Sequence, residues 1–378
     1  MGDPDGQVFL LTLPDLLNAT PILSILKLQA GVVSLEPDQV LKLADGTATL
    51  PDALFQSDPV TWFGSAMRYG FVAQPAASTV RILPAQLNFG VTGTGIVAVI
   101  DTGVDSDHPA LRSALLPGYD FIRNVDGSAD EKGDVTQSTT GVVDNGNPFF
   151  VSGTVSALLN SATALLIGPD NAAFGHGTMV AGIVHLTAPG AQILPLKAFR
   201  PDGTGYLSDV VRALYYASRR GARVVNMSFT FASPSAEMRR AVDYATQHGA
   251  VCIAAAGNDG SSLPRYPAAF DNVMAIASTG NLDNKSSFSN YGPNWIWIAA
   301  PGEGIITTYP FSTFAAGWGT SFSAPFVAGT ISLLLQTTPD LDFAKAASAV
   351  AQAQPVSSEM GHGRLDVFRA VQAAVSQH

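Results

Sequence analysis

From residue 95 onward the chain alternates short apolar runs with longer segments of helical character. The apolar runs, which have the length and β-branched content of buried strands, are 95–101, 192–199, 223–229, 250–257 and 273–279. The helical segments between them are about 177–186, 207–220 and 234–248. Strands that alternate with helices form parallel sheets whose faces the helices cover. We therefore predict an α/β fold with three layers and a doubly wound, mainly parallel sheet.

Length and composition suit one large domain with a small appendage. The chain has 378 residues, 47% hydrophobic and only 13% charged, so it can bury a sizeable core and is not a disordered chain. The formal net charge of −10 argues against a nucleic-acid partner, because phosphate binding needs basic patches. No apolar run reaches about 18 residues, so we expect no membrane-spanning helix. A single cysteine excludes an intramolecular disulfide and a cysteine-based zinc site.

Four motifs place reactive side chains at strand ends and helix starts. Asp101 ends the first apolar strand and is followed by Thr-Gly. His176 lies between two glycines and opens a helix of small and apolar residues. Asn258 follows an apolar strand, and Ser321, in Gly-Thr-Ser, precedes an apolar helix-like run. In open α/β sheets, side chains at the carboxyl ends of strands line the functional site.

These residue types suit nucleophilic catalysis on a peptide bond. A serine hydroxyl is a weak nucleophile at neutral pH, so a base must take its proton as it attacks. His176 suits that role, because an imidazole titrates near neutral pH and can later protonate the leaving amine. Asp101 would hold the tautomer of His176 and stabilise the imidazolium. The helix start at Ser321 offers backbone N–H groups to a developing oxyanion.

The four motifs, in this order, resemble those of the subtilisin-like serine peptidases, the subtilases. The resemblance covers residues 79–378. It implies a serine endopeptidase that cleaves proteins or peptides through an acyl-enzyme, with Asp101, His176 and Ser321 as the triad. It also implies an oxyanion hole made by the Asn258 side chain and the backbone N–H of Ser321. From it we expect a monomer that requires no cofactor and binds no membrane.

The same resemblance implies where a substrate binds. Subtilases pair an extended substrate between two edge segments, which here are Gly203, Thr204 and Gly205 on one side and Ser228, Phe229 and Thr230 on the other. Ala255 and Gly257 would wall the pocket for the residue before the cut bond. Arg265 would lie at its base. We hypothesise that Arg265 favours an acidic side chain there; the alternative is that it points to solvent.

We predict no metal site. Many subtilases bind calcium through a carboxylate at the position that Ala110 occupies here. A weak structural cation on backbone carbonyls near Ala268, Phe270 and Val273 is the alternative. The acidic stretch is interpreted as a solvated loop rather than a calcium loop, and it contains Asp120, Asp126, Asp130, Glu131 and Asp134.

The N-terminal part has a different pattern. We predict strands at 7–13, 32–35 and 40–43, with a helix at 14–30. This small α+β segment, 1–44, resembles the second half of a subtilase propeptide, a unit that assists folding and inhibits the active site until it is cleaved. The alternative is a strand-adding extension of the catalytic domain. Residues 45–78 are interpreted as a linker and the start of the mature enzyme.

Two further features bear on organisation. The stretch between Asp101 and His176 is long for a compact subtilase, and an insertion at about 134–172 would account for it, either as a lid near the active-site rim or as a passive loop. The start of the sequence is acidic and lacks the basic-then-apolar pattern of a secretory signal. Because such subtilases are exported, we expect a secreted enzyme whose signal is absent from this sequence. An intracellular enzyme is the alternative.

Three other interpretations compete. An aspartic peptidase also uses Asp-Thr-Gly, but it needs a second such motif, which the sequence lacks. A dinucleotide-binding domain would place its glycines after the first strand, whereas Gly93 and Gly95 precede it. An inactive binding module on a peptidase fold stays open, although every expected catalytic position is filled.

Overall fold

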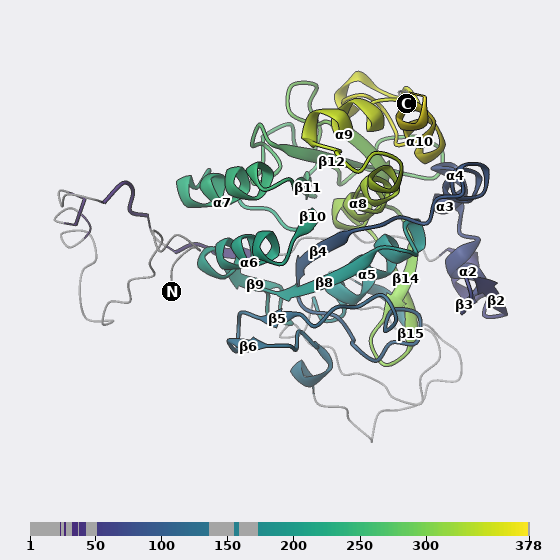
Figure 1. Cartoon of the computed structure of the whole chain (residues 1–378), viewed down its shortest axis with the longest axis horizontal. Coiled ribbons are helices and arrows are strands. Elements are labelled where there is room, and N and C mark those ends of the chain that lie inside the picture. The colour runs from purple at the N-terminus through teal and green to yellow at the C-terminus, as the bar shows by residue number, and fades with distance from the viewer. Residues whose placement is uncertain are drawn as a thin grey trace.

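The computed structural model describes residues 23, 26–27, 32–36, 38–42, 51–135, 155–158 and 173–376. A sheet forms the middle of three layers (Figure 1). Helices α5 (His176–Thr187) and α8 (Thr320–Thr337) cover one face, and α6 (Leu207–Arg219) and α7 (Ala236–Gln247) cover the other (Figure 1). Each face buries its own hydrophobic cluster against the sheet. The predicted α/β fold is confirmed.

The sheet is parallel except at one edge. Across it lie β13 (Ile298–Pro301), β12 (Val273–Thr279), β11 (Val251–Ala255), β10 (Ala222–Met227), β4 (Ile96–Asp101), β8 (Gln192–Lys197), β5 (Tyr119–Asp120) and β6 (Val125–Asp126). Only β5 and β6 pair antiparallel. All five strands and all three helices that were predicted from residue 95 onward form, with ends shifted by a few residues. Strand β13 was not predicted, although it lies at the end of the apolar run 295–300.

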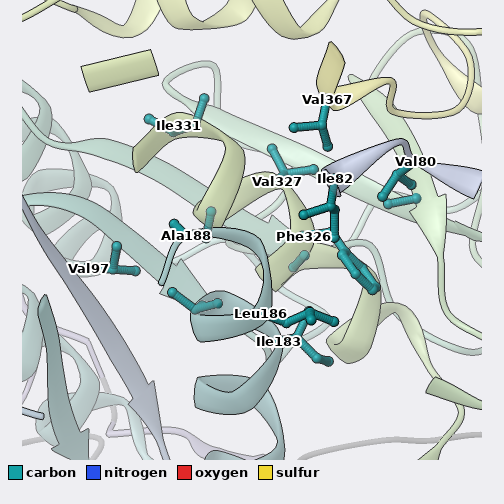
Figure 2. Close-up of a cluster of buried hydrophobic side chains, with 14 of the residues drawn as sticks. Val80, Ile82, Val97, Ile183, Leu186, Ala188, Phe326, Val327, Ile331 and Val367 are labelled. Carbon is teal, nitrogen blue, oxygen red and sulfur yellow. The ribbon is translucent and has the colours of Figure 1, made fainter. Parts of the chain in front are cut away.

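Helices α5 and α8 lie side by side in one hydrophobic cluster. Figure 2 shows Ile183 of α5 and Phe326 of α8 in this cluster, together with Val80 and Val367 from other parts of the chain. At Gly329 of α8 an added Cβ atom would lie only 2.5 Å from the Cβ atom of Thr187, so a larger residue would push the two helices apart. This contact fixes the relative position of two helices that each carry a predicted catalytic residue, His176 or Ser321, in the first turn. No described helix is long and apolar enough to cross a membrane.

The predicted insertion contributes a strand to a second, antiparallel sheet. Strands β14 (Ile305–Tyr309) and β15 (Thr313–Gly317) form a hairpin, and β7 (Val155–Leu158) pairs with β15. Residues 136–154 and 159–172 lie outside the described part of the chain. Residues 155–158 of the insertion therefore pair with β15, the strand that directly precedes the segment leading to Ser321.

The described part of the predicted linker, 51–78, is folded. It contains η1 (Asp52–Phe55), the hairpin of β2 (Pro59–Trp62) and β3 (Ser65–Arg68), and the short helices α2 (Tyr69–Val72) and α3 (Pro75–Thr79). Its side chains Trp62, Met67 and Phe71 are buried in the α5–α8 cluster. Helix α4 (Ile82–Phe89) follows this stretch and packs on the C-terminal helix α10 (Val367–Val375). The other C-terminal elements are α9 (Phe343–Val350) and η4 (Ser358–Met360). The stretch thus belongs to the core rather than to a free connection.

The N-terminal segment lies on the α6 and α7 side of the sheet. Strand β1 (Val40–Lys42) forms where the sequence predicts a strand, and it pairs antiparallel with β9 (Thr204–Tyr206). The strand predicted at 32–35 is absent, because these residues run beside α7 with Ser34 hydrogen-bonded to Glu237 and not along another strand. The predicted strand 7–13 and most of the predicted helix 14–30 lie outside the described residues.

The acidic stretch is only in part the solvated loop that the sequence predicts, because Asp126 is exposed but Asp120, Glu131 and the side chain of Asp134 are buried. Asp134, at the end of η2 (Lys132–Asp134), forms a buried ion pair with Lys197 of β8, with 2.6 Å between Oδ2 and Nζ and 1% exposure of each side chain. The Lys197 ammonium also donates to the carbonyl oxygens of Thr102 and Phe199. Arg123 binds both Asp134 and the buried Asp120. Asp134 turns inward because the buried ammonium of Lys197 requires a partner of opposite charge.

Removing this lysine should destabilise the fold. In Lys197→Met, the buried Asp134 carboxylate keeps only the half-exposed Arg123 as an ionic partner. We expect the free energy of unfolding, measured by urea denaturation, to fall by about 3 kcal/mol. The double variant Lys197→Met/Asp134→Leu should regain part of this loss, because a packed apolar pair leaves no uncompensated charge. A single variant as stable as the parent would contradict the assigned role of the ion pair.

Candidate active site

Asp101 and His176 meet where the end of β4 touches the start of α5. His176 Nδ1 lies 2.6 Å from Asp101 Oδ1, and both side chains are buried. The backbone N–H of Thr102 donates to the same carboxylate oxygen at 2.7 Å. An added Cβ at Gly177 would lie 2.0 Å from the carbonyl oxygen of Gly103, so a glycine is required for the helix to start this close to the strand. The bond to Asp101 makes Nδ1 the protonated nitrogen of a neutral imidazole and Nε2 the basic one.

Ser321 is the second residue of α8 and is held by Ser228, just beyond β10. The hydroxyl of Ser321 donates to the carbonyl oxygen of Ser228 at 3.1 Å, and the hydroxyl of Ser228 donates to the carbonyl oxygen of Ser321 at 2.9 Å. The second bond has a cause in the sequence. Pro325 lies four residues after Ser321 and has no N–H, so the helix cannot use the Ser321 carbonyl. Ser228 satisfies that acceptor instead.

Asn258 is fixed by Thr320, the residue before Ser321. Its side-chain oxygen accepts hydrogen bonds from the backbone N–H and the hydroxyl of Thr320, both at 2.9 Å. The same hydroxyl accepts the backbone N–H of Gly257 at 3.0 Å. Because Oδ1 is the accepting end, Nδ2 is the donating end of this amide. The arrangement places an amide donor beside the start of α8.

The elements that carry the four residues converge at the start of α8. The ring of His176 lies 5.5 Å, between centroids, from the ring of Phe322, which follows Ser321. Asn258 binds the residue before Ser321. The structure therefore gathers the Asp101–His176 pair, Ser321 and Asn258, which the sequence places far apart.

The predicted substrate-binding segments lie in β9 and just beyond β10. Gly205 and Thr204 lie in β9, where β1 already pairs with them, and Gly203 precedes that strand. Ser228 contacts Ser321 directly. Phe229, by contrast, packs in the core against Phe199 at 5.0 Å, so it offers its backbone rather than its side chain.

Of the remaining predicted pocket residues, Gly257 and Arg265 lie next to each other. Ala255 ends β11, two residues before Gly257, and Thr230 is half-buried. Arg265 lies beside Gly257, since a Cβ added to that glycine would be 3.4 Å from Arg265 Cγ. Its Nε binds Asp259 Oδ2 at 2.9 Å, and 26% of the side chain is exposed. Arg265 is thus held beside Gly257 by an ion pair that the sequence did not predict.

A cluster of three carboxylates nearby already holds a cation of the chain itself. Asp105, Asp107 and Asp130 lie close enough together to share an ion. The Lys132 ammonium lies among them, 3.0 Å from Asp105 and 3.7 Å from Asp130, and is also bonded to Asp107. The ammonium compensates the negative charge that a bound metal ion would otherwise compensate.

Sequence reasoning missed Glu131, which is fully buried beneath the His176 helix. Its carboxylate accepts hydrogen bonds from Thr102, Gly175 and Thr178. Its position in an acidic stretch suggested solvent, and no spacing rule links it to His176. The only signal was indirect: Gly175, at the helix N-cap position, has no side chain with which to cap α5.

Comparisons with known proteins agree with this geometry. The model of the subtilase family matches residues 93–363. Thermitase of Thermoactinomyces vulgaris is 34% identical over 278 residues, which span 73% of this chain and 88% of thermitase. Subtilisin BL of Lederbergia lenta is 37% identical over 257 residues, 68% of this chain and 82% of that one. A solved protease structure from Pseudoalteromonas arctica is similar with a TM-score of 0.60 and 27% identity, covering 81% of this chain and 94% of that one. The chain belongs to the subtilase family and is a subtilisin-like serine protease.

Proposed function

We propose that the protein hydrolyses peptide bonds within proteins through an acyl-enzyme, with Asp101, His176 and Ser321 as the catalytic triad. The observation that carries this proposal is the 2.6 Å contact between His176 Nδ1 and Asp101, placed beside the start of α8. That contact leaves Nε2 as the base. A protein substrate follows from the family, whose relatives are proteases.

The geometry supports the following sequence of steps. The Ser321 hydroxyl leaves the Ser228 carbonyl, gives its proton to His176 Nε2, and Oγ bonds to the substrate carbonyl carbon. The carbonyl oxygen becomes an oxyanion, which the Ser321 N–H and Asn258 Nδ2 stabilise. The C–N bond breaks as His176 protonates the leaving amine. Water, deprotonated by His176, then releases the acid and restores Ser321. These steps use only groups of the chain and call for no organic cofactor.

A cleavage map tests the endopeptidase assignment. The full-length protein and its Ser321→Ala variant are incubated with a mixed peptide library, and cut sites are read by mass spectrometry. We expect internal cleavage by the parent alone, because only Ser321 supplies the nucleophile. A covalent serine probe should label Ser321 in the parent. A folded parent that neither cleaves nor labels would support the inactive binding module instead.

We also propose that the N-terminal segment acts as an inhibitory propeptide. Its strand β1 occupies β9, the edge assigned to the substrate, and Leu41 at its centre is 1% exposed. Two acidic side chains cap the helices below. Asp38 accepts from the N–H and hydroxyl of Ser208 at the start of α6, and Glu36 accepts from Ser235 and the N–H of Ala236 at the start of α7. A carboxylate at a helix N-terminus is favoured by the helix dipole.

Detaching the N-terminal segment from β9 should make the proposed active site more accessible. In full-length Leu41→Asp, a charge replaces a buried apolar side chain, so β1 should detach from β9. We expect the rate at which the covalent probe labels Ser321 to rise about tenfold or more. Val33→Asp is the matched control, because Val33 lies in the same segment but is 87% exposed. Equal labelling rates in the parent and Leu41→Asp would argue that the segment is only a strand-adding extension.

Arg265 is proposed to select an acidic residue before the cut bond. The stem of its side chain lies beside Gly257, which the resemblance places in the wall of the pocket, but Asp259 already binds Nε. In Arg265→Gly the preference for Glu over Leu should disappear. In Asp259→Asn it should rise about tenfold, because a competing carboxylate is removed while the side chain keeps its size. The ratio of kcat/KM for two peptides that differ only at this position measures both; a ratio unchanged in Arg265→Gly would exclude the role.

Three sequence-based expectations stay predictions. These are secretion, a monomeric state and a weak cation site near Ala268, Phe270 and Val273. At the last of these, the carbonyl oxygen of Phe270 already accepts the N–H of Val273 at 3.1 Å.

A further inference from the structure

Glu131 touches residues on both sides of the catalytic pair, although it lies in neither motif. Its carboxylate binds Thr102, which follows Asp101, and Gly175, which precedes His176. It also binds Thr178, on the first turn of α5. We propose that ionised Glu131 is a positioning residue that holds Asp101 and His176 in their productive arrangement. The inference rests on the proposed triad and adds a residue to it that acts without touching substrate.

All four groups around the carboxylate are donors. Oε2 accepts from Gly175 N at 3.0 Å and from the Thr102 hydroxyl at 2.8 Å. Oε1 accepts from Thr178 N at 3.2 Å and from the Thr178 hydroxyl. Each hydroxyl also accepts a backbone N–H, from Gly177 at 2.9 Å for Thr102 and from Asp105 at 2.8 Å for Thr178, and donates its own proton to Glu131.

This set of donors favours the ionised carboxylate. Two carboxylate oxygens can accept four hydrogen bonds, whereas a protonated carboxyl directs its own O–H at one of the four donors. Protonation would therefore break or reverse at least one bond to the end of β4 or the start of α5. Since the contact between His176 and Asp101 spans those two ends, a shift there changes the geometry of the base. Small misplacements of catalytic groups cost up to about a hundredfold in rate.

Burial brings this ionisation into the working pH range. It raises the pKa of Glu131 to about 7, while hydrogen bonds from Thr178 and Thr102 and the charge of Lys197 on β8 oppose the rise. Asp101 on β4 adds to it, and Tyr309 on β14 and His176 on α5 are the other titratable groups nearby. Because the folded pKa lies above the unfolded one, the ionised group costs stability that is regained as the pH falls from 7 toward 4.5. The form that positions His176 is thus the less stable one.

The decisive variant is Glu131→Gln, which keeps the shape and removes the charge. We expect kcat at pH 8 to fall at least about tenfold while KM changes by less than about twofold, because substrate contacts are untouched. In the parent, two protonations, of His176 and Glu131, should steepen the acid limb of log kcat toward a slope of 2. In Glu131→Gln the slope should be 1. Asp120→Asn is the matched control: it removes another buried carboxylate of the acidic stretch, which pairs with Arg123, and should leave the limb unchanged.

A second readout does not need activity. In a Ser321→Ala background, the His176 proton shared with Asp101 should give a low-field proton resonance, and Glu131→Gln should shift or broaden it. An unchanged resonance and an unchanged acid limb in a folded variant would overturn the inference while leaving the proposed function intact. If the parent itself neither cleaves nor labels, the proposed function fails, and the resonance alone decides whether Glu131 positions the pair.

Discussion

The rest of the site depends on how closely the start of α5 approaches the end of β4. At Gly177 the backbone of the helix lies where any Cβ would collide with Gly103, and this closeness lets His176 reach Asp101. A second close approach, at Gly329, places α8 against α5. Two close contacts at glycines thus align a strand end and two helices. The positions of the reactive side chains are therefore set by how closely the backbone segments pack.

Much of the fold and the candidate site could be predicted from the sequence. Strand and helix periods gave the parallel sheet, and the motifs at Asp101, His176, Asn258 and Ser321 mark positions that the structure brings together. Each of these signals is local: a strand followed by a reactive side chain, or a glycine before a helix. Such local signals can be recognised in the sequence without knowledge of the tertiary contacts.

What could not be predicted depends on contacts between distant segments. Glu131 and Asp134 belong to a stretch that looks solvated, and only the positions of Lys197 and of the start of α5 turn them inward. Arg265 was assigned to the pocket from resemblance, but its partner Asp259 is visible only in three dimensions. The strand expected at 32–35 is missing because Ser34 and Glu36 bind α7. Buried charge and edge pairing are thus decided by tertiary structure.

The pairing of β1 with β9 has a consequence for the life of the protein before it meets a substrate. The edge of β9 on which a substrate is proposed to pair is also an edge on which another unfolded chain can add itself and begin to aggregate. While β1 is in place, that edge is closed within the same molecule. The N-terminal segment would therefore keep a newly made chain from associating with other chains through β9. If the segment were removed later, this edge would be exposed only after the rest of the fold had formed.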